Sequence, residues 1–276
     1  MLLTCAPGAQ LRPFVRCVWL SDQSAPQEPL EAHRENVLPT GDMHLVFRLS
    51  ERPVVLFDRS AEAPELVLGH AVVGGPRSGY YTKDVSLPAR SVGVQLRPGA
   101  AEALFGMPAS EFTERHVRLE DLWGRSASLI RDRLIEASDP QRQLRVLEAI
   151  LSKRLPQPRA LHPAVAGALQ QFASTRSVRE AVRRSGYSHR GFVALFRRSV
   201  GLAPKRYARV LRFQNVLAEC AANRDVAWAD LAMKAGYSDQ AHFNREFREF
   251  AGVTPESYRR VAPRASHHVP VPPDFR

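Results

Sequence analysis

Residues 236–258 read GYSDQAHFNREFREFAGVTPESY, and residues 186–207 read GYSHRGFVALFRRSVGLAPKRY. The two stretches are one unit written twice, at an offset of 50 to 51 residues. A repeat at this spacing indicates a duplicated supersecondary unit. Each copy begins with Gly-Tyr-Ser, continues with two phenylalanines four residues apart, and closes with Gly, Pro and Tyr. This order predicts a helix, a tight turn, a second helix and a stop.

The local chemistry of each copy agrees with that prediction. The glycine of Gly-Tyr-Ser can adopt the positive φ of a tight turn, and Ser188 or Ser238 is then expected to cap the next helix. The phenylalanines recur at i and i+4, which indicates a buried face that we expect the tyrosine to share. A helix over residues 204–221 is predicted to join the copies. The predicted core positions are Tyr187, Phe192 and Phe196 in copy one, and Tyr237, Phe243, Phe247 and Phe250 in copy two.

The net charge is concentrated in the half of the chain that carries the repeat. Residues 156–276 contain 20 Lys and Arg against 9 Asp and Glu, whereas residues 1–155 contain 19 of each. The whole excess of +11 therefore lies with the repeat. A basic face is the electrostatic footprint of nucleic-acid binding, although a basic surface can also serve solubility alone. Combined with the repeated helical unit, the charge favours duplex DNA as the partner.

The first part of the chain has a different period. Short runs with β-branched or aromatic residues predict strands at 15–20, 44–49, 54–57, 66–68 and 92–96. Helices are predicted at 100–105, 125–137 and 141–155, and the last one places leucines at 144, 147, 151 and 155 on one face. We expect this face to pack on the sheet, with a dimer seam as the alternative. The first domain is thus predicted to be a small sandwich or barrel followed by helices.

These patterns predict an α+β chain in four segments: a regulatory domain at 1–155, a linker at 156–160, an all-α domain at 161–262 and a disordered tail at 263–276. The linker is placed at Pro156-Gln157-Pro158-Arg159 because two prolines interrupt both helix and sheet. The tail is rich in proline and has too few apolar residues to build a core.

Several functional classes find no support in the sequence. No apolar run approaches the roughly 20 residues that span a bilayer, and the N-terminus lacks the pattern of a signal peptide. Cys5, Cys17 and Cys220 have neither the number nor the spacing of a disulfide scaffold or zinc site, which suits a reducing cytoplasm. No nucleophile–base pair, carboxylate pair or metal cluster is visible, so we expect neither an enzyme nor a cofactor.

Residues 174–260 resemble the tandem helix-turn-helix domain of the AraC/XylS transcriptional regulators, over about a third of the chain. The resemblance is carried by residues 236–243 (GYSDQAHF), by residues 252–255 (GVTP), by Tyr258, and by the first copy. It implies that the second helix of each copy enters a major groove, about one DNA turn from the other. The implied partner is double-stranded promoter DNA. RNA polymerase, a small-molecule effector and a second copy of the chain are further candidate partners, and no membrane partner is expected.

The resemblance also implies a set of DNA-facing residues. Arginine suits guanine, glutamine suits adenine, and small apolar groups suit a thymine methyl. Copy one departs from the family at Ala194, where arginine is usual, so we expect it to read fewer bases by hydrogen bonds. Arg198, Lys205 and Arg206 are expected at phosphates, together with Arg197. The full DNA-facing set is His189, Arg190, Val193, Ala194 and Arg197 in copy one, and Gln240, Ala241, His242, Asn244 and Arg245 in copy two.

Signals for a ligand in the first domain are weaker. The phrases LPTGD at 38–42 and LRPGA at 96–100 stand out but identify no ligand. An effector pocket could be lined by Asp42, His44, Arg97 and Trp123, although turn, strand-end and core roles suit them equally. A metal site is not expected, because no His-x-His pair occurs among His33, His44, His70 and His116.

The leading hypothesis is a sequence-specific transcription factor whose first domain senses an effector or dimerises. Two alternatives stay open at this point. One is an enzyme or small-ligand-binding domain that the helix-turn-helix half delivers to DNA. The other is an architectural DNA-binding protein without sequence preference.

Overall fold

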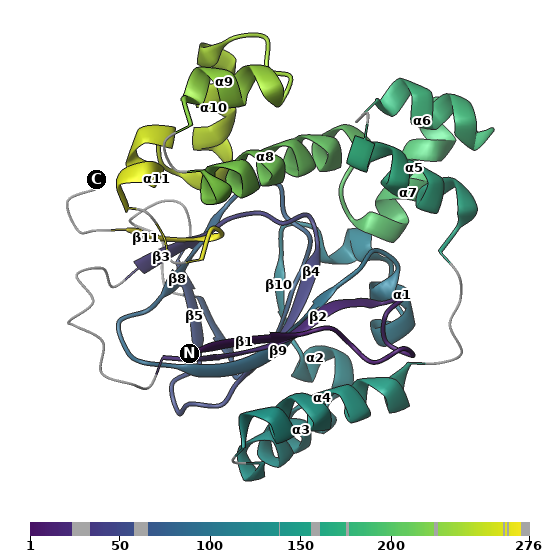
Figure 1. Ribbon diagram of the computed structural model, residues 1–276. Coiled ribbons are helices and arrows are strands. Elements are labelled where there is room, and N and C mark those ends of the chain that lie inside the picture. Colours follow the sequence, from purple (N-terminus) through teal and green to yellow (C-terminus); the bar gives the residue numbers. More distant parts are fainter. Residues whose placement is uncertain are drawn as a thin grey trace.

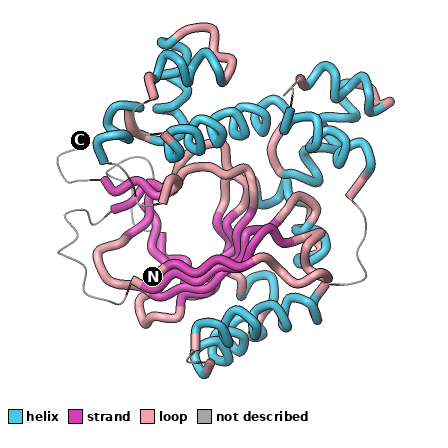
Figure 2. The backbone as a smooth tube through the Cα atoms, in the orientation of Figure 1, coloured by secondary structure: helices cyan, strands magenta, loops and turns pink. Residues whose placement is uncertain are grey.

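The computed structural model describes residues 1–23, 34–57, 66–137, 139–155, 161–174, 177–223, 226–261, 263 and 265–271. The α+β prediction is confirmed, since strands and a few helices come first and an all-helical region follows (Figure 1, Figure 2). The predicted linker at 156–160 lies outside the described residues. The segment boundaries therefore stay predictions.

The larger sheet has six strands in the order β1-β2-β9-β4-β7-β10, and all neighbours are antiparallel. Along β4, Met43, Leu45 and Phe47 alternate with less buried residues and lie on one face, as a half-covered strand requires. The bounds are β1 (Leu2–Cys5), β2 (Val15–Asp22), β9 (Arg90–Leu96), β4 (Met43–Arg48), β7 (Ala71–Gly74) and β10 (His116–Arg118).

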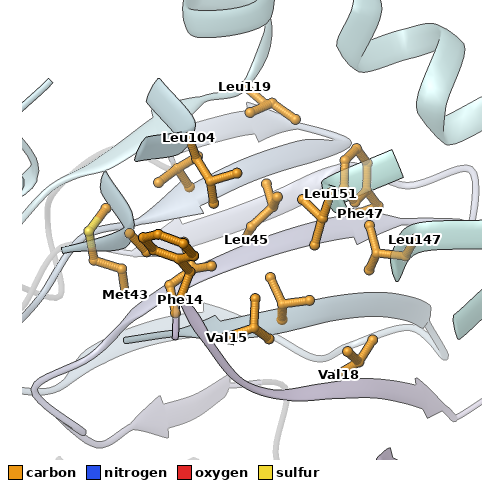
Figure 3. Packing of buried hydrophobic residues seen from close by; sticks show 14 of the residues in the cluster. Phe14, Val15, Val18, Met43, Leu45, Phe47, Leu104, Leu119, Leu147 and Leu151 are labelled. Atoms are coloured by element: carbon orange, nitrogen blue, oxygen red, sulfur yellow. The ribbon is translucent and has the colours of Figure 1, made fainter. Parts of the chain in front are cut away.

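Helices cover that face of the sheet. Figure 3 shows Leu147 and Leu151 beside Leu45 and Phe47 in one apolar cluster. The leucine stripe therefore packs on the sheet, as expected, and the dimer seam is the wrong alternative. The helical elements here are α1 (Ala100–Phe105), the 3-10 helix η1 (Ala109–Phe112), α2 (Glu120–Trp123), α3 (Ser126–Glu136) and α4 (Pro140–Arg154). Among the described residues, no helix is long and apolar enough to cross a membrane.

The smaller sheet has five strands in the order β11-β3-β8-β5-β6. Leu56 and Leu68 of this sheet meet Val72 of the larger one in a small cluster, so the two sheets pack face to face as a sandwich. The sequence did not predict β3 or β8, because their residues RENV and YTKD are mostly polar and show no alternation. The bounds are β11 (His268–Val271), β3 (Arg34–Val37), β8 (Tyr81–Asp84), β5 (Val54–Phe57) and β6 (Leu66–Gly69).

The prediction of a disordered tail at 263–276 was wrong for residues 268–271. Residues 268–271 form β11, which pairs antiparallel with β3 and places Val269 opposite Asn36. Val269 is fully buried. The tail is too polar to build a core of its own, but a strand added to an existing sheet edge needs none. Residues 268–271 thus return to the domain in which the chain began.

The second domain is helical, as predicted. Its long helix α8 runs across the β domain in Figure 1, with α5 to α7 at one end and α9 to α11 at the other. The predicted linking helix at 204–221 corresponds to α8 within one residue. The bounds are α5 (Pro163–Ser174), α6 (Val178–Ser185), α7 (His189–Val200), α8 (Pro204–Ala222), α9 (Trp228–Lys234), α10 (Gln240–Ala251) and α11 (Pro255–Val261).

Candidate nucleic-acid interface

Copy one forms a helix-turn-helix from α6 and α7. Gly186 ends α6 with φ of 73°, a left-handed conformation that glycine adopts without a steric penalty. Ser188 caps α7 by accepting a hydrogen bond from the Gly191 amide at 3.2 Å. Both features were predicted. They set the direction in which α7 leaves the turn.

Copy two forms the same unit from α9 and α10, with a different cap. The cap is Asp239, not Ser238, and its carboxylate accepts a hydrogen bond from the His242 amide at 2.7 Å. The Ser238 hydroxyl donates to Asp239 instead. A carboxylate is the stronger acceptor and also complements the positive end of the helix. The hydrogen bond from the His242 amide accordingly lowers the pKa of Asp239.

An equivalent aromatic contact stabilises each of the two copies. Tyr207 packs on Phe196 with ring centroids 5.7 Å apart, and Tyr258 packs on Phe247 at 5.6 Å. The closing tyrosine of the repeat therefore rests on the second phenylalanine in both copies. All five phenylalanines predicted as core in α7 and α10 are fully buried.

The tyrosines of the two Gly-Tyr-Ser motifs differ. Tyr237 is buried as predicted, but Tyr187 is 45% exposed and the prediction was wrong there. The Tyr187 hydroxyl lies 3.2 Å from Nε2 of His162. Tyr237 is held inward because its hydroxyl donates to Glu246 at 2.8 Å. Copy one has Leu195 at the position that corresponds to Glu246, so it offers no such carboxylate.

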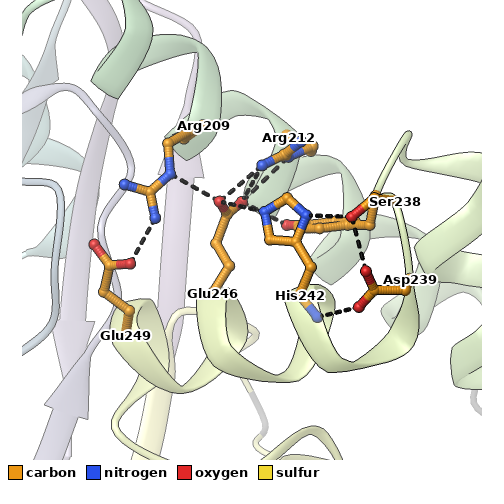
Figure 4. A network of polar contacts seen from close by, with 8 residues as sticks. Arg209, Arg212, Ser238, Asp239, His242, Glu246 and Glu249 are labelled. Carbon is orange, nitrogen blue, oxygen red and sulfur yellow. Dashed lines mark hydrogen bonds and ion pairs between the residues drawn. The ribbon is translucent and has the colours of Figure 1, made fainter.

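Glu246 is the residue of this domain that the sequence did not single out. Its side chain is 2% exposed, and it accepts hydrogen bonds from Arg209 at 2.7 Å and from Arg212 at 2.7 Å (Figure 4). Burial would raise the pKa of Glu246, but the hydrogen bonds from Arg209, Arg212 and Tyr237 outweigh it and lower the pKa. The network connects α10 to α8 and so fixes the orientation of α10 relative to α8.

The structure gathers each predicted DNA-facing set on one helix and leaves most of it exposed. The copy-one set lies on α7 and the copy-two set on α10, on the side opposite the buried phenylalanines. Val193 and His242 are half-buried. The exposed members are His189, Arg190, Ala194 and Arg197 on α7, and Gln240, Ala241, Asn244 and Arg245 on α10.

Arg190 on α7 and Arg245 on α10 are both exposed. In the described part of the chain, Arg190 and Arg245 make neither an ion pair nor a side-chain hydrogen bond, so both can turn toward DNA. His242 is more constrained, because its ring packs edge-on against Tyr237 and its Nδ1 lies 3.1 Å from the Ser238 hydroxyl.

Two residues expected at phosphates have partners in the first domain instead. Arg198 donates to Glu102 at 2.9 Å, and Arg206 lies 3.9 Å from Glu114. Both arginines therefore face the first domain. The sequence could not distinguish them from DNA-facing arginines, because the acidic partners lie nearly a hundred residues away.

The four residues considered for an effector pocket do not form one. Asp42 is buried and accepts hydrogen bonds from Arg16 at 2.7 Å and Gln95 at 2.9 Å. It shares with Arg97 a cavity of about 10 Å³ between the two domains, which has room for about one water molecule. Trp123 lies elsewhere and donates to the Leu104 carbonyl at 3.1 Å.

The histidines considered for a metal site are also separate. His44 contacts the Thr40 hydroxyl at 3.2 Å, His70 contacts the Glu51 carbonyl, and His116 contacts Arg77 at 3.0 Å. Burial lowers the pKa of His44 to about 4 and that of His116 to about 3. Across the described residues no cluster of three potential metal ligands occurs, and His33 lies outside them.

Two family models match the chain. A domain of unknown function, DUF6597, matches residues 3–118, which is most of the β sandwich. A helix-turn-helix domain matches residues 166–261, which is the whole of the duplicated unit with α5 in front of it. Residues 166–261 are thus an AraC-type helix-turn-helix domain. This match covers the second domain, where the sequence resemblance also lay.

Curated relatives match over the same region. An HTH-type transcriptional regulator of Haemophilus influenzae is 24% identical over 104 residues, or 38% of this chain. The HTH-type transcriptional regulator YtdP of Bacillus subtilis is 28% identical over 90 residues, or 33% of this chain. These matches span 35% of the first relative and 12% of the second.

Solved structures resemble the chain at lower identity. Unliganded ToxT from Vibrio cholerae, in a variant form, has a TM-score of 0.48 at 11% identity and covers 92% of this chain and 98% of its own. ToxT with a bound unsaturated fatty acid also scores 0.48, at 10% identity and 94% coverage of both chains. The C-terminal domain of AraT from Geobacillus stearothermophilus scores 0.34 at 20% identity, over 37% of this chain and 88% of its own.

Proposed function

We propose that this chain regulates transcription by binding promoter DNA in a sequence-specific manner. One observation carries the proposal: α7 and α10 are equivalent helices of one duplicated unit, joined by α8, and both expose their predicted base-facing sides. The net charge of residues 156–276 supports it, because Lys and Arg attract the phosphate backbone. The names of the two curated relatives point the same way.

The two helices are proposed to read DNA unequally. Copy two presents Gln240 and Arg245, which are suited to adenine and guanine edges in the major groove. Copy one presents Arg190 as its main hydrogen-bonding side chain, with Ala194 and the half-buried Val193 suited only to apolar contact. We therefore expect the half-site under α10 to be the more strictly defined one.

The first domain is proposed to sense an effector or to form a dimer. RNA polymerase remains a candidate partner of the DNA-bound protein. No observation among the described residues favours an enzyme delivered to DNA, and we do not propose one.

The test begins with selection of bound sequences from a random duplex library by the full chain. Arg245→Ala should then weaken binding to the selected site by roughly 1–3 kcal/mol and relax the preference at one base pair. Arg145→Ala is the matched control for loss of one positive charge, because Arg145 is exposed on α4 in the first domain. It should leave both affinity and preference unchanged.

Three outcomes would contradict the proposal or its contact assignment. A library without an enriched sequence would indicate an architectural DNA-binding protein. Binding that does not weaken with added salt would exclude phosphate contacts as a main source of affinity. An Arg245→Ala variant that selects the wild-type sequence would show that Arg245 does not read a base.

A further inference from the structure

The glycines that end α7 and α10 occupy equivalent positions in the repeat, and both rest against the first domain. At the end of α7, a β-carbon on Gly201 would lie 2.2 Å from Cγ of Pro76 and 3.0 Å from the Ala109 carbonyl oxygen. Real β-carbons do not approach other atoms so closely. The close approach of the two backbones therefore requires glycine at this position.

Two hydrogen bonds and an ion pair secure the first contact. The Thr113 hydroxyl donates to the Gly201 carbonyl at 2.7 Å, and the Gly99 amide donates to the Ser199 carbonyl at 3.1 Å. Arg198 and Glu102 add the ion pair at 2.9 Å. The end of α7 is thus held by α1, η1 and the segments beside them.

The equivalent glycine of α10 is held in the same way by other elements. A β-carbon on Gly252 would lie 2.6 Å from Cζ of Tyr80 and 2.7 Å from Nδ2 of Asn36. The Asn36 amide donates to the Ala251 carbonyl at 3.2 Å and accepts from the Thr82 hydroxyl at 2.8 Å. Asn36 is thereby oriented by β8 and bonded to the last turn of α10.

The C-terminal strand β11 adds a second contact between copy two and the first domain. β11 follows α11 after only six residues and pairs with β3, the strand that carries Asn36. The Tyr258 hydroxyl of α11 donates to the Ser266 carbonyl at 2.9 Å, and His268 contacts Glu35 at 2.5 Å. Copy two is therefore tied to the smaller sheet both through α10 and through the chain that leaves α11.

The linking helix is held between these two contacts. A β-carbon on Gly41 would lie 3.2 Å from Cε2 of Tyr207 and 3.4 Å from Val210, and Gln214 donates to the Pro39 carbonyl. Three successive parts of the second domain thus contact one sandwich: the end of α7, the face of α8 and the end of α10. Figure 1 shows this sandwich below all three.

The contacts lie at the C-terminal ends of α7 and α10, whereas the predicted base-facing residues begin at their N-terminal turns. The docked first domain therefore leaves His189, Arg190, Gln240 and Ala241 exposed. Docking is compatible with DNA binding on the opposite side of the helix pair.

We propose that the first domain is a bracket that sets the distance and mutual orientation of the two recognition helices, and so selects operators by the spacing of their half-sites. A single helix linking two units can bend, whereas a sandwich docked to both units resists relative motion. One inserted base pair moves a half-site by about 3.4 Å and rotates it by about 35°. A rigid pair of helices cannot follow that change. This inference rests on the proposed function of the helix-turn-helix domain.

The test measures the spacing of half-sites selected from a random duplex library by the full chain and its variants. Gly252→Ala introduces the clash with Tyr80 and Asn36. Gly106→Ala is its matched control, because both glycines end a helix in the left-handed region, with φ of 69° and 73°, and a β-carbon on Gly106 meets nothing within 4 Å. Backbone strain is therefore similar in the two variants, and only Gly252→Ala disturbs the contact between the two domains.

A second variant covers the case in which Gly252→Ala does not fold, as judged by circular dichroism. Thr113→Val combined with Glu102→Gln removes the Gly201 hydrogen bond and the Arg198 ion pair without altering the helix-turn-helix domain. Wild type and Gly106→Ala should select one spacing, and one inserted base pair should weaken their binding about tenfold. Gly252→Ala and the double variant should keep both half-site sequences but accept spacings that differ by a base pair.

Each possible result bears either on the bracket or on the proposed function. If both docking variants select the same single spacing as wild type, the bracket is refuted while DNA recognition stands. If they bind the wild-type site more tightly, docking inhibits binding and the bracket is again refuted. If wild type enriches no sequence at all, the proposed function itself fails.

Discussion

Replacing Glu246 by glutamine should loosen α10 without changing any exposed residue of the proposed interface. The carboxylate of Glu246 accepts hydrogen bonds from Arg209, Arg212 and Tyr237, and its side chain is 2% exposed. Glutamine has nearly the same volume, but it carries no charge and has one acceptor oxygen. The two arginines would then lose their shared counter-charge.

The size of the effect follows from the burial of the partners. Removing one member of a buried ion pair generally costs roughly 3–5 kcal/mol. Here the arginine side chains are 29% and 17% exposed, so water can partly solvate them after the change. We therefore expect a loss of about 2–3 kcal/mol in the local stability of copy two.

Hydrogen exchange is the suitable assay, because a chain with two domains need not unfold in one step. The most protected amides of α10 should exchange roughly 30- to 150-fold faster in Glu246→Gln, which corresponds to 2–3 kcal/mol. Amides of α7 serve as an internal reference. Glu249→Gln is the control variant, since Glu249 is 48% exposed and, among the described residues, pairs with Arg209 alone. This variant should cost less than about 1 kcal/mol.

The pH dependence gives a separate check on the same reasoning. The pKa of Glu246 is lowered in the folded protein, so its contribution is present above the unfolded-state value of about 4.3 and is lost as the pH falls through the folded-state value. The difference between wild type and Glu246→Gln should shrink over that interval. Equal exchange rates in Glu246→Gln and Glu249→Gln at neutral pH would refute the assigned role of Glu246.

Two further predictions concern the first domain. Burial lowers the pKa of His116 to about 3, so the stability that His116 contributes above pH 6.5 is lost as the pH falls. In urea unfolding, wild type should therefore lose more stability between pH 7.5 and 5 than His116→Gln does. The difference between the two losses should be about 1–2 kcal/mol. A β-carbon on Gly75 would lie 1.7 Å from the Phe112 carbonyl oxygen, so Gly75→Ala should lower the free energy of unfolding by at least about 3 kcal/mol. A β-carbon on Gly8 meets nothing within 4 Å, so the control Gly8→Ala should leave the melting temperature nearly unchanged.

Much of the helix-turn-helix domain could be predicted from the sequence because its signals are local. The capping role of Ser188, the turn at Gly186 and the burial of Phe192 each depend on neighbours within one or two turns of helix. The exchange of caps between Ser238 and Asp239 shows the limit of that reasoning, since adjacent residues can compete for one helix end. Which of the two residues caps the helix depends on where the backbone places each side-chain oxygen.

The two recognition helices of the candidate site could be predicted from the sequence, but the contacts that hold them in place could not. Both recognition helices and their exposed sides followed from the 3.6-residue period. The burial of Glu246 did not, because a glutamate on an amphipathic helix is normally exposed and only Arg209 and Arg212 on another helix make its burial tolerable. Likewise, nothing local distinguishes Arg198, which pairs with the first domain, from the exposed Arg197 beside it.

The sequence by itself determined the duplication, the turns and the inward faces of α7 and α10, because these depend on periodicity and on the conformational freedom of single residues. Only the tertiary structure decided that the tail becomes β11, that Asn36 holds the end of α10, and that Gly201 and Gly252 are contact points as well as helix ends. Those features join residues as far apart as 34 and 271. Contacts over such separations depend on the packed fold, and no short stretch of sequence specifies them.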